Sequence, residues 1–67
     1  MQANKLKAKI MEKGLTQKDL AQQIGICDKT FYSKMEKGNW GIEEVADIVK
    51  ILGLSKEEML AIFFADE

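Results

Sequence analysis

The chain has 67 residues and a formal net charge of −1, with no histidine, no proline and one cysteine. This length predicts a single domain, and the lack of histidine together with a lone cysteine excludes a zinc finger or a disulfide scaffold. No apolar run reaches the ~20 residues of a membrane span and no signal peptide opens the chain, so we expect a cytoplasmic protein without membrane contact. The absence of proline favours helices, and we expect one all-α domain over residues 1–67.

Charge is distributed unevenly along the chain. Residues 1–40 contain eight lysines and four acidic residues, a balance of +4, whereas residues 41–67 contain two lysines and seven acidic residues, a balance of −5. Such asymmetry suggests that one end of the protein faces a polyanion. Mixed charge on solvated helices is the alternative explanation.

Two short amphipathic helices are expected in the first part of the chain. The first, over residues 3–13, places Leu6 and Ile10 on a buried face. Its lysines face either phosphate groups or plain solvent. The second helix, over residues 17–24, follows Thr16, whose hydroxyl is expected to cap it.

A third helix is expected over residues 28–37, with Cys27 at its cap and with Phe31 and Met35 facing the core. Gly25 ends the preceding helix, where a left-handed conformation costs a glycine least. Two amphipathic helices joined by so short a turn predict a helix-turn-helix. The side chains left on the outer side of the third helix are Asp28, Lys29, Tyr32 and Ser33.

The fourth helix, over residues 42–52, is the most apolar. Its expected stripe is Ile42, Val45, Ala46, Val49 and Leu52, widened by Ile48 and Ile51. A stripe this wide predicts burial on more than one side and a central place in the fold. The fifth helix, over residues 56–64, follows a capping box formed by Ser55 and Glu58, the strongest local signal in the chain.

The C-terminal cluster carries more apolar surface than one helix face can bury. We expect Leu60 and Phe63 in the core, which leaves Ile62 and Phe64 exposed, together with Met59. Self-association is the expected use of this patch, and a frayed terminus is the alternative. The candidate dimer interface consists of these three residues and the neighbouring Phe63, that is, Met59, Ile62, Phe63 and Phe64.

A wider pattern connects these elements. It consists of Thr16-Gln17-x-x-Leu20-Ala21-x-x-Ile24-Gly25-Ile26, Phe31, the turn at Gly38 and Leu52-Gly53-Leu54-Ser55. Over nearly the whole chain this pattern closely resembles the lambda-repressor-like family of helix-turn-helix proteins, of the Cro and phage-repressor type. The resemblance implies a compact five-helix domain, with the second and third helices as the helix-turn-helix, which binds a symmetric operator in double-stranded DNA as a homodimer.

The resemblance also implies the residues that contact DNA, from the start of the second helix, the third helix and the turn after it. They are Thr16, Gln17, Lys18, Asp28, Lys29, Tyr32, Ser33, Lys37 and Asn39. Asp28 either accepts a hydrogen bond from a cytosine amine or stabilises the positive end of its helix. Lys29 is a base or phosphate contact or a solvated lysine. Tyr32 contacts DNA or packs on the second helix, and Trp40 is core or a phosphate donor.

The chain departs from the family pattern in three places. Cys27 stands where the cap is usually serine or threonine, and Lys34 stands where many members have an apolar residue, a role that Met35 takes here. Asp28 brings a negative charge to a position that usually contacts bases. The chain also has no arginine, the commonest bidentate partner of guanine, which leaves Lys29 as the nearest substitute.

The sequence therefore predicts a sequence-specific DNA-binding transcriptional regulator, similar to phage or prophage repressors, that acts on the nucleoid of a bacterial or phage-infected cell. The alternative is a protein-interaction module with the same fold, such as an antitoxin or adaptor. We expect no enzyme, because Cys27 has no histidine to activate it and no carboxylate pair or phosphate-binding glycine loop is evident. We also expect no cofactor, metal or small-molecule ligand.

Overall fold

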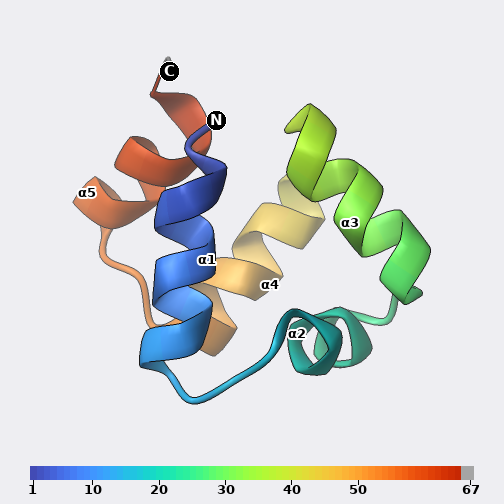
Figure 1. Cartoon of the computed structure of the whole chain (residues 1–67). Coiled ribbons are helices and arrows are strands. Elements are labelled where there is room, and N and C mark those ends of the chain that lie inside the picture. The colour runs from blue at the N-terminus through green and yellow to red at the C-terminus, as the bar shows by residue number, and fades with distance from the viewer. Residues whose placement is uncertain (66–67) are drawn as a thin grey trace.

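The computed structural model describes residues 1–65, which form five helices and no strand (Figure 1). They are α1 (Ala3–Glu12), α2 (Gln17–Ile24), α3 (Asp28–Lys37), α4 (Ile42–Leu52) and α5 (Lys56–Met59), which continues into a π-helical segment, η1 (Leu60–Phe64). The predicted all-α, five-helix fold is confirmed. Residues 66 and 67, which the predicted domain includes, lie outside the described residues.

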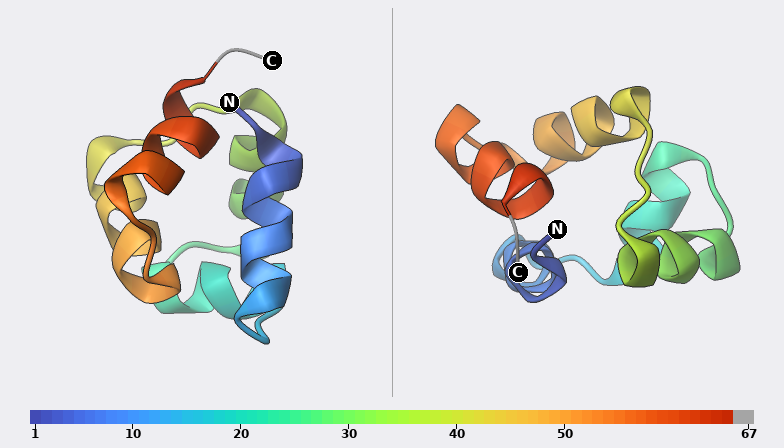
Figure 2. Two further views of the ribbon diagram at one scale, coloured as in Figure 1. Left: turned by 90° about the vertical axis from the view of Figure 1, so that its left-hand side faces the viewer. Right: turned by 90° about the horizontal axis from the view of Figure 1, so that it is seen from above.

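Apolar side chains alone make the core of residues 1–65. The buried residues are Leu6, Ile10, Leu20, Ala21, Phe31, Met35, Ile48, Leu52, Leu54 and Ile62. Each of the helices α1 to α4 contributes two of them. In α1, α3 and α4 the two lie at i and i+4, on one face of the helix, whereas Leu20 and Ala21 of α2 are neighbours in sequence. In Figure 2 the segment α5–η1 lies beside α1, and α2 lies between α3 and α4. The α2–α3 pair is therefore supported from one side only, and its other side is open.

Glu58 connects α5 to α1 through an ion pair. Its carboxylate forms an ion pair with the Nζ of Lys9, and its Oε1 accepts a hydrogen bond from the backbone N–H of Ser55 at 2.9 Å. The hydroxyl of Ser55 accepts in turn from the N–H of Glu58 at 3.1 Å, so the predicted capping box is confirmed. The bond from Lys9 and the bond from Ser55 lower the pKa of Glu58 to about 2.

This lowered pKa predicts a loss of stability in acid. A carboxyl group whose pKa is lower in the folded state stabilises the fold above its unfolded pKa, and this contribution disappears as pH falls towards its folded pKa. We therefore expect the melting temperature of the protein to fall between about pH 4.5 and pH 2. Glu58→Gln should melt at a lower temperature than the wild type at pH 7 and approach it at pH 2. Thermal unfolding followed by circular dichroism measures both curves.

Glu57→Gln is the matched control for this experiment. Glu57 is exposed and lies one residue away from Glu58 on α5, on a different face of the helix. Replacing Glu57 should leave the difference between the melting temperatures at pH 7 and pH 2 the same as in the wild type. If Glu58→Gln and Glu57→Gln gave the same pH profile, the ion pair between α1 and α5 would not contribute to acid stability.

The packing of the C-terminal segment corrects one prediction. Leu60, expected in the core, is 44% exposed, and Ile62, expected at the surface, is only 2% exposed. Glu58 and Ile62 lie one turn apart on the same side of the C-terminal segment, which faces α1. The carbonyl of Ile62 also accepts a hydrogen bond from the N–H of Gln2 at 2.7 Å. Ile62 therefore leaves the candidate dimer interface.

The environment of α4 corrects a second prediction. Ile48 and Leu52 are buried, but Ile42 is 89% exposed and Ala46 is also exposed. The expected burial on more than one side is wrong because the C-terminal segment packs on α1 and leaves the first half of α4 uncovered. The stripe instead borders an open groove of about 520 Å³. The walls of this groove include Trp40, Ile42, Val45, Val49, Met59, Phe63 and Phe64.

Candidate nucleic-acid interface

The second and third helices form a unit of two helices joined by a short turn, which we call the α2–α3 unit (residues 16–38). Gly25 ends α2 in the left-handed conformation at φ +79°, where a side chain would be strained. The N–H of Ile26 then donates to the carbonyl of Ala21 at 3.0 Å, which closes the end of the helix. Ala21 is fully buried, and its small side chain lets α3 approach α2 closely.

The start of α2 is held by a reciprocal pair of hydrogen bonds. The Oγ1 of Thr16 accepts from the N–H of Asp19 at 3.0 Å, and the Oδ2 of Asp19 accepts from the N–H of Thr16 at 2.9 Å. The backbone bond from Thr16 lowers the pKa of Asp19. The predicted cap is confirmed, so the Thr16 hydroxyl is already engaged in it. Gln17 and Lys18 follow in the first turn, where free backbone N–H groups attract anions.

The outward side of α3 is defined by what the helix buries. Phe31 and Met35 face the core, and Phe31 meets the ring of Trp40 edge-on with centroids 5.2 Å apart. On the opposite side, Lys29, Ser33 and Lys37 lie at i, i+4 and i+8 and form one ridge along the helix. We call these three residues the α3 ridge. Lys29 and Lys37 are exposed and Ser33 is half-buried.

Tyr32 and Glu36 flank the α3 ridge, and Asp28 lies towards the buried side of the helix, seven residues before Met35. Tyr32 is 51% exposed, and its ring meets Phe31 of the same helix edge-on. Asp28 is half-buried in the first turn, where a carboxylate stabilises the positive end of a helix. Glu36 is exposed beside the ridge and was not singled out by the sequence analysis. Its spacing of seven residues from Lys29 is the signal that places it there, and it reduces the positive charge of this side.

Two lysines of the basic half form ion pairs within the protein. Lys34 bridges to Glu44 at 3.0 Å and ties α3 to α4, and Lys9 pairs with Glu12 and Glu58. The bond from the N–H of Gly41 and the contact with Lys34 lower the pKa of Glu44. The basic charge available to a polyanion is therefore smaller than the sequence suggests.

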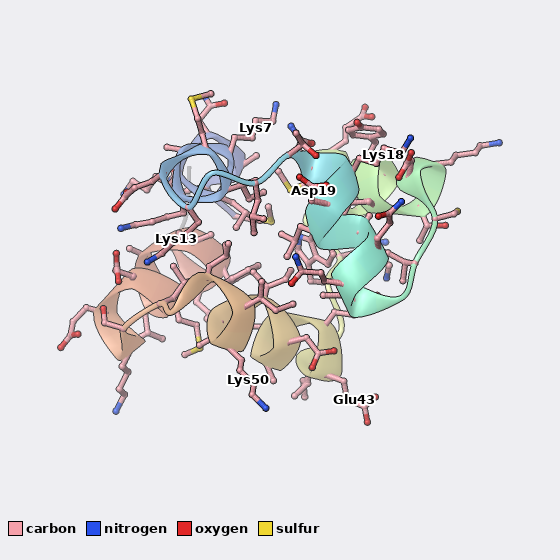
Figure 3. All side chains as sticks on the ribbon, turned by 90° about the horizontal axis from the view of Figure 1, so that it is seen from below. Lys7, Lys13, Lys18, Asp19, Glu43 and Lys50 are labelled. Carbon is pink, nitrogen blue, oxygen red and sulfur yellow. The ribbon has the colours of Figure 1, made fainter. Side chains whose placement is uncertain are left out.

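Two of the remaining lysines, Lys7 and Lys18, lie at one edge of the molecule. Figure 3 shows Lys7 of α1 and Lys18 of α2 at the same edge, and α4 at the opposite edge. Both are exposed. The side of the protein that carries Lys7 and Lys18 is therefore the basic side, and the α4 side is its reverse.

The turn after α3 is only partly available for contacts. Lys37 and Asn39 are exposed on either side of Gly38, as the resemblance requires of phosphate contacts. Trp40 is half-buried, and its Nε1 is buried without a hydrogen-bond partner among residues 1–65. Of the two roles considered for Trp40, the core role is confirmed, because a buried N–H does not reach a phosphate.

Cys27 lies exposed at the junction of α2 and α3. Its Sγ lies 3.1 Å from the Oγ1 of Thr30, and this hydrogen bond is the main cause of a lowered pKa of the thiol. The side chain of Cys27 makes no capping bond to α3. Within residues 1–65 no group of three or more potential ligands is placed to hold a metal ion, and no helix has the length and apolar character to cross a membrane.

Comparison with known proteins places the chain in one family. The protein belongs to the family described as protein of unknown function (DUF739), whose family model matches residues 2–67. No curated protein and no solved structure matches the chain. The fold and the α2–α3 unit are therefore the basis on which a function is proposed.

Proposed function

We propose that this protein is a sequence-specific DNA-binding regulator in which α3 enters the major groove of an operator. The observation that carries the proposal is the α3 ridge, with two exposed lysines and a serine on the side opposite Phe31 and Met35. A helix of ten residues is about 15 Å long, and the major groove of B-DNA is about 12 Å wide. The helix-turn-helix resemblance points to the same side of the same helix.

Each part of the interface has a chemical role in this proposal. Lys29 and Ser33 contact base edges or phosphates from the α3 ridge, and Asp28 accepts from a cytosine amine. Gln17 and Lys18 hold a phosphate at the start of α2, where the helix dipole favours an anion. Lys37 and Asn39 hold a second phosphate beyond α3, and Thr16 supports the first phosphate contact by fixing the start of α2.

The operator complex is proposed to contain two copies of the chain. Exposed apolar side chains at the C-terminus, Phe64 above all at 66% exposure, provide the contact between copies, with Met59 and Phe63 beside it. A symmetric pair places two α3 helices in successive major grooves, about 34 Å apart. Repression then follows from occlusion of a promoter.

The salt dependence of DNA binding tests this proposal. With roughly six to eight phosphate contacts per pair of copies, log K should fall with log salt concentration at a slope of about −5 to −7. Lys37→Gln removes one phosphate contact per copy and should make the slope less steep by about 2. Fluorescence anisotropy on a labelled duplex measures both slopes. A slope near zero would overturn the proposal, and Lys56→Gln, on α5, is the control that should retain the wild-type slope.

A protein-interaction module is the second candidate function. The open groove beside α4 favours it, because a groove with mainly apolar walls is typical of a surface that binds a partner. In this case the protein binds no DNA sequence specifically, and the α3 ridge is an ordinary solvated surface. A gel shift against random-sequence DNA separates the two candidates, since only the first predicts a retained fraction.

A further inference from the structure

The exposed side of α4 has a pattern that complements itself. Glu43, Ala46 and Lys50 lie at i, i+3 and i+7 and share one side of the helix, with Ile42 and Val49 beside them. Figure 3 shows Glu43 and Lys50 projecting outwards near opposite ends of α4. We call these five residues the α4 face.

The α4 face is apolar along one side and charged along the other. Ile42 is the most exposed large apolar side chain of the described residues, at 89%, and Ala46 is exposed next to it. Val49 is half-buried and borders the groove. Exposed apolar surface of this kind marks an interaction site. The proposed DNA contacts do not use it, and the proposed C-terminal contact of the operator complex lies on the other wall of the same groove, at Met59, Phe63 and Phe64.

The charges on the α4 face specify the direction of a partner. Glu43 lies near the start of the helix and Lys50 two turns later, about 10 Å along the axis. In a second α4 laid antiparallel on the first, each Glu43 meets the Lys50 of the other copy, and Ile42 packs beside Val49. The centre of the pattern is Ala46, whose small side chain lets two helix axes approach closely. A surface that is complementary to itself in this way forms a closed two-fold pair.

We propose that the α4 face binds a second copy of this chain, with the two α4 helices antiparallel and crossing at Ala46. This pair differs from the proposed operator complex. Lys7 and Lys18 lie at the edge of the molecule opposite Glu43 and Lys50 (Figure 3), so the α2–α3 units of the pair point away from each other. The two α2–α3 units of such a pair therefore do not contact the same side of one DNA duplex together. This step rests on the proposed function: the back-to-back pair holds two DNA duplexes, one on each of its outer sides.

Charge reversal and charge exchange on the α4 face test the pair. Glu43→Lys places two lysines together at each end of the interface, and Lys50→Glu places two glutamates together. Each single reversal should weaken self-association of the full chain without DNA roughly 10- to 30-fold. The double variant Glu43→Lys/Lys50→Glu restores both opposite-charge contacts and should recover association to within about threefold. Sedimentation equilibrium measures the association constants, and Glu36→Lys on α3 is the control for a charge change elsewhere.

Thermal unfolding separates the interface from an effect on the helix itself. An acid at the start and a base at the end of α4 also suit the helix dipole, so the double variant should melt at a lower temperature than either single variant. Association should nevertheless be stronger in the double variant, which a change in folding does not explain. Ala46→Glu introduces a like-charge clash at the crossing point, at an exposed position that the fold tolerates, and should abolish the pair.

The proposal is overturned if the wild type is monomeric at the highest soluble concentration, or if single reversals associate as strongly as the wild type. It is also overturned if the double variant associates more weakly than both singles. Association that responds to Phe64→Ser but not to the charge reversals would point to the C-terminal contact alone. DNA binding is measured separately by anisotropy, so failure of the α4 pair and failure of the proposed function are distinguishable. Loss of DNA binding with self-association intact would remove the two-duplex role and leave the pair itself.

Discussion

Phe31→Ala is expected to lower the free energy of unfolding by about 3–5 kcal/mol. Phe31 is fully buried, and its ring packs edge-on against Trp40. Truncation removes this packing and leaves a cavity at the junction of α3 with the core. A chain of this length is stable by only roughly 3–10 kcal/mol, so a large part of the variant should be unfolded at 37 °C. Urea denaturation followed by circular dichroism measures the difference.

Phe64→Ala is the matched control for the core variant, because it makes the same chemical change at an exposed ring. At low protein concentration it should alter the free energy of unfolding by no more than about 0.5 kcal/mol. Equal losses in the two variants would contradict the core described here, in which Phe31 is central and Phe64 is peripheral.

Lys29→Glu is expected to weaken specific DNA binding at least about 100-fold while leaving the melting temperature nearly unchanged. Lys29 is exposed on the α3 ridge, and the proposed operator complex contains it twice, once from each copy. Loss of one base or phosphate contact costs about 1–3 kcal/mol, and the reversed charge adds repulsion from the phosphates. Anisotropy titration with an operator duplex and thermal unfolding of the free protein measure the two quantities.

Lys56→Glu is the control for this variant, because it reverses an exposed lysine on α5, at the opposite end of the molecule from α3 (Figure 1). It should bind DNA within about threefold of the wild type. A large fall in melting temperature for Lys29→Glu would instead make Lys29 a structural residue. Equal losses of DNA binding in both variants would reduce the interaction to net charge alone.

Local signals account for the parts of the fold that the sequence predicts well. The start of α2 follows from the Thr16 cap, and α2, α3 and α4 each end at a glycine, signals that act within one turn of the chain. The capping pairs at Thr16 and Ser55 form as expected. The apolar role of Met35 is confirmed as well, and the neighbouring Lys34 is satisfied by Glu44.

Contacts between distant segments account for the errors. The buried side of the C-terminal segment is the side that contacts α1, through Ile62 and the pairing of Glu58 with Lys9, and periodicity within residues 56–64 does not reveal it. The apolar stripe of α4 was expected to be buried because a wide stripe usually is. Its exposure depends on η1 packing against α1, again a contact between segments far apart in sequence.

The same contrast between local signals and distant contacts applies to the candidate nucleic-acid interface. Spacing alone predicts that Lys29 and Ser33 lie opposite Phe31, and the structure places them there. Spacing does not show which lysines are already paired, so Lys9 and Lys34 are recognised as structural only through their acidic partners. The exposed α4 face was missed because its apolar residues had been assigned to the core.

Selection of binding sites from a pool of random DNA duplexes tests the central claim most directly. If the α2–α3 unit binds DNA through the α3 ridge, the wild-type protein should enrich one sequence with two-fold symmetry, whose half-sites lie about 34 Å apart. The Lys29→Glu variant should enrich none from the same pool. A wild-type pool that stays random after repeated rounds would contradict the account and leave the α2–α3 unit without a role in binding DNA.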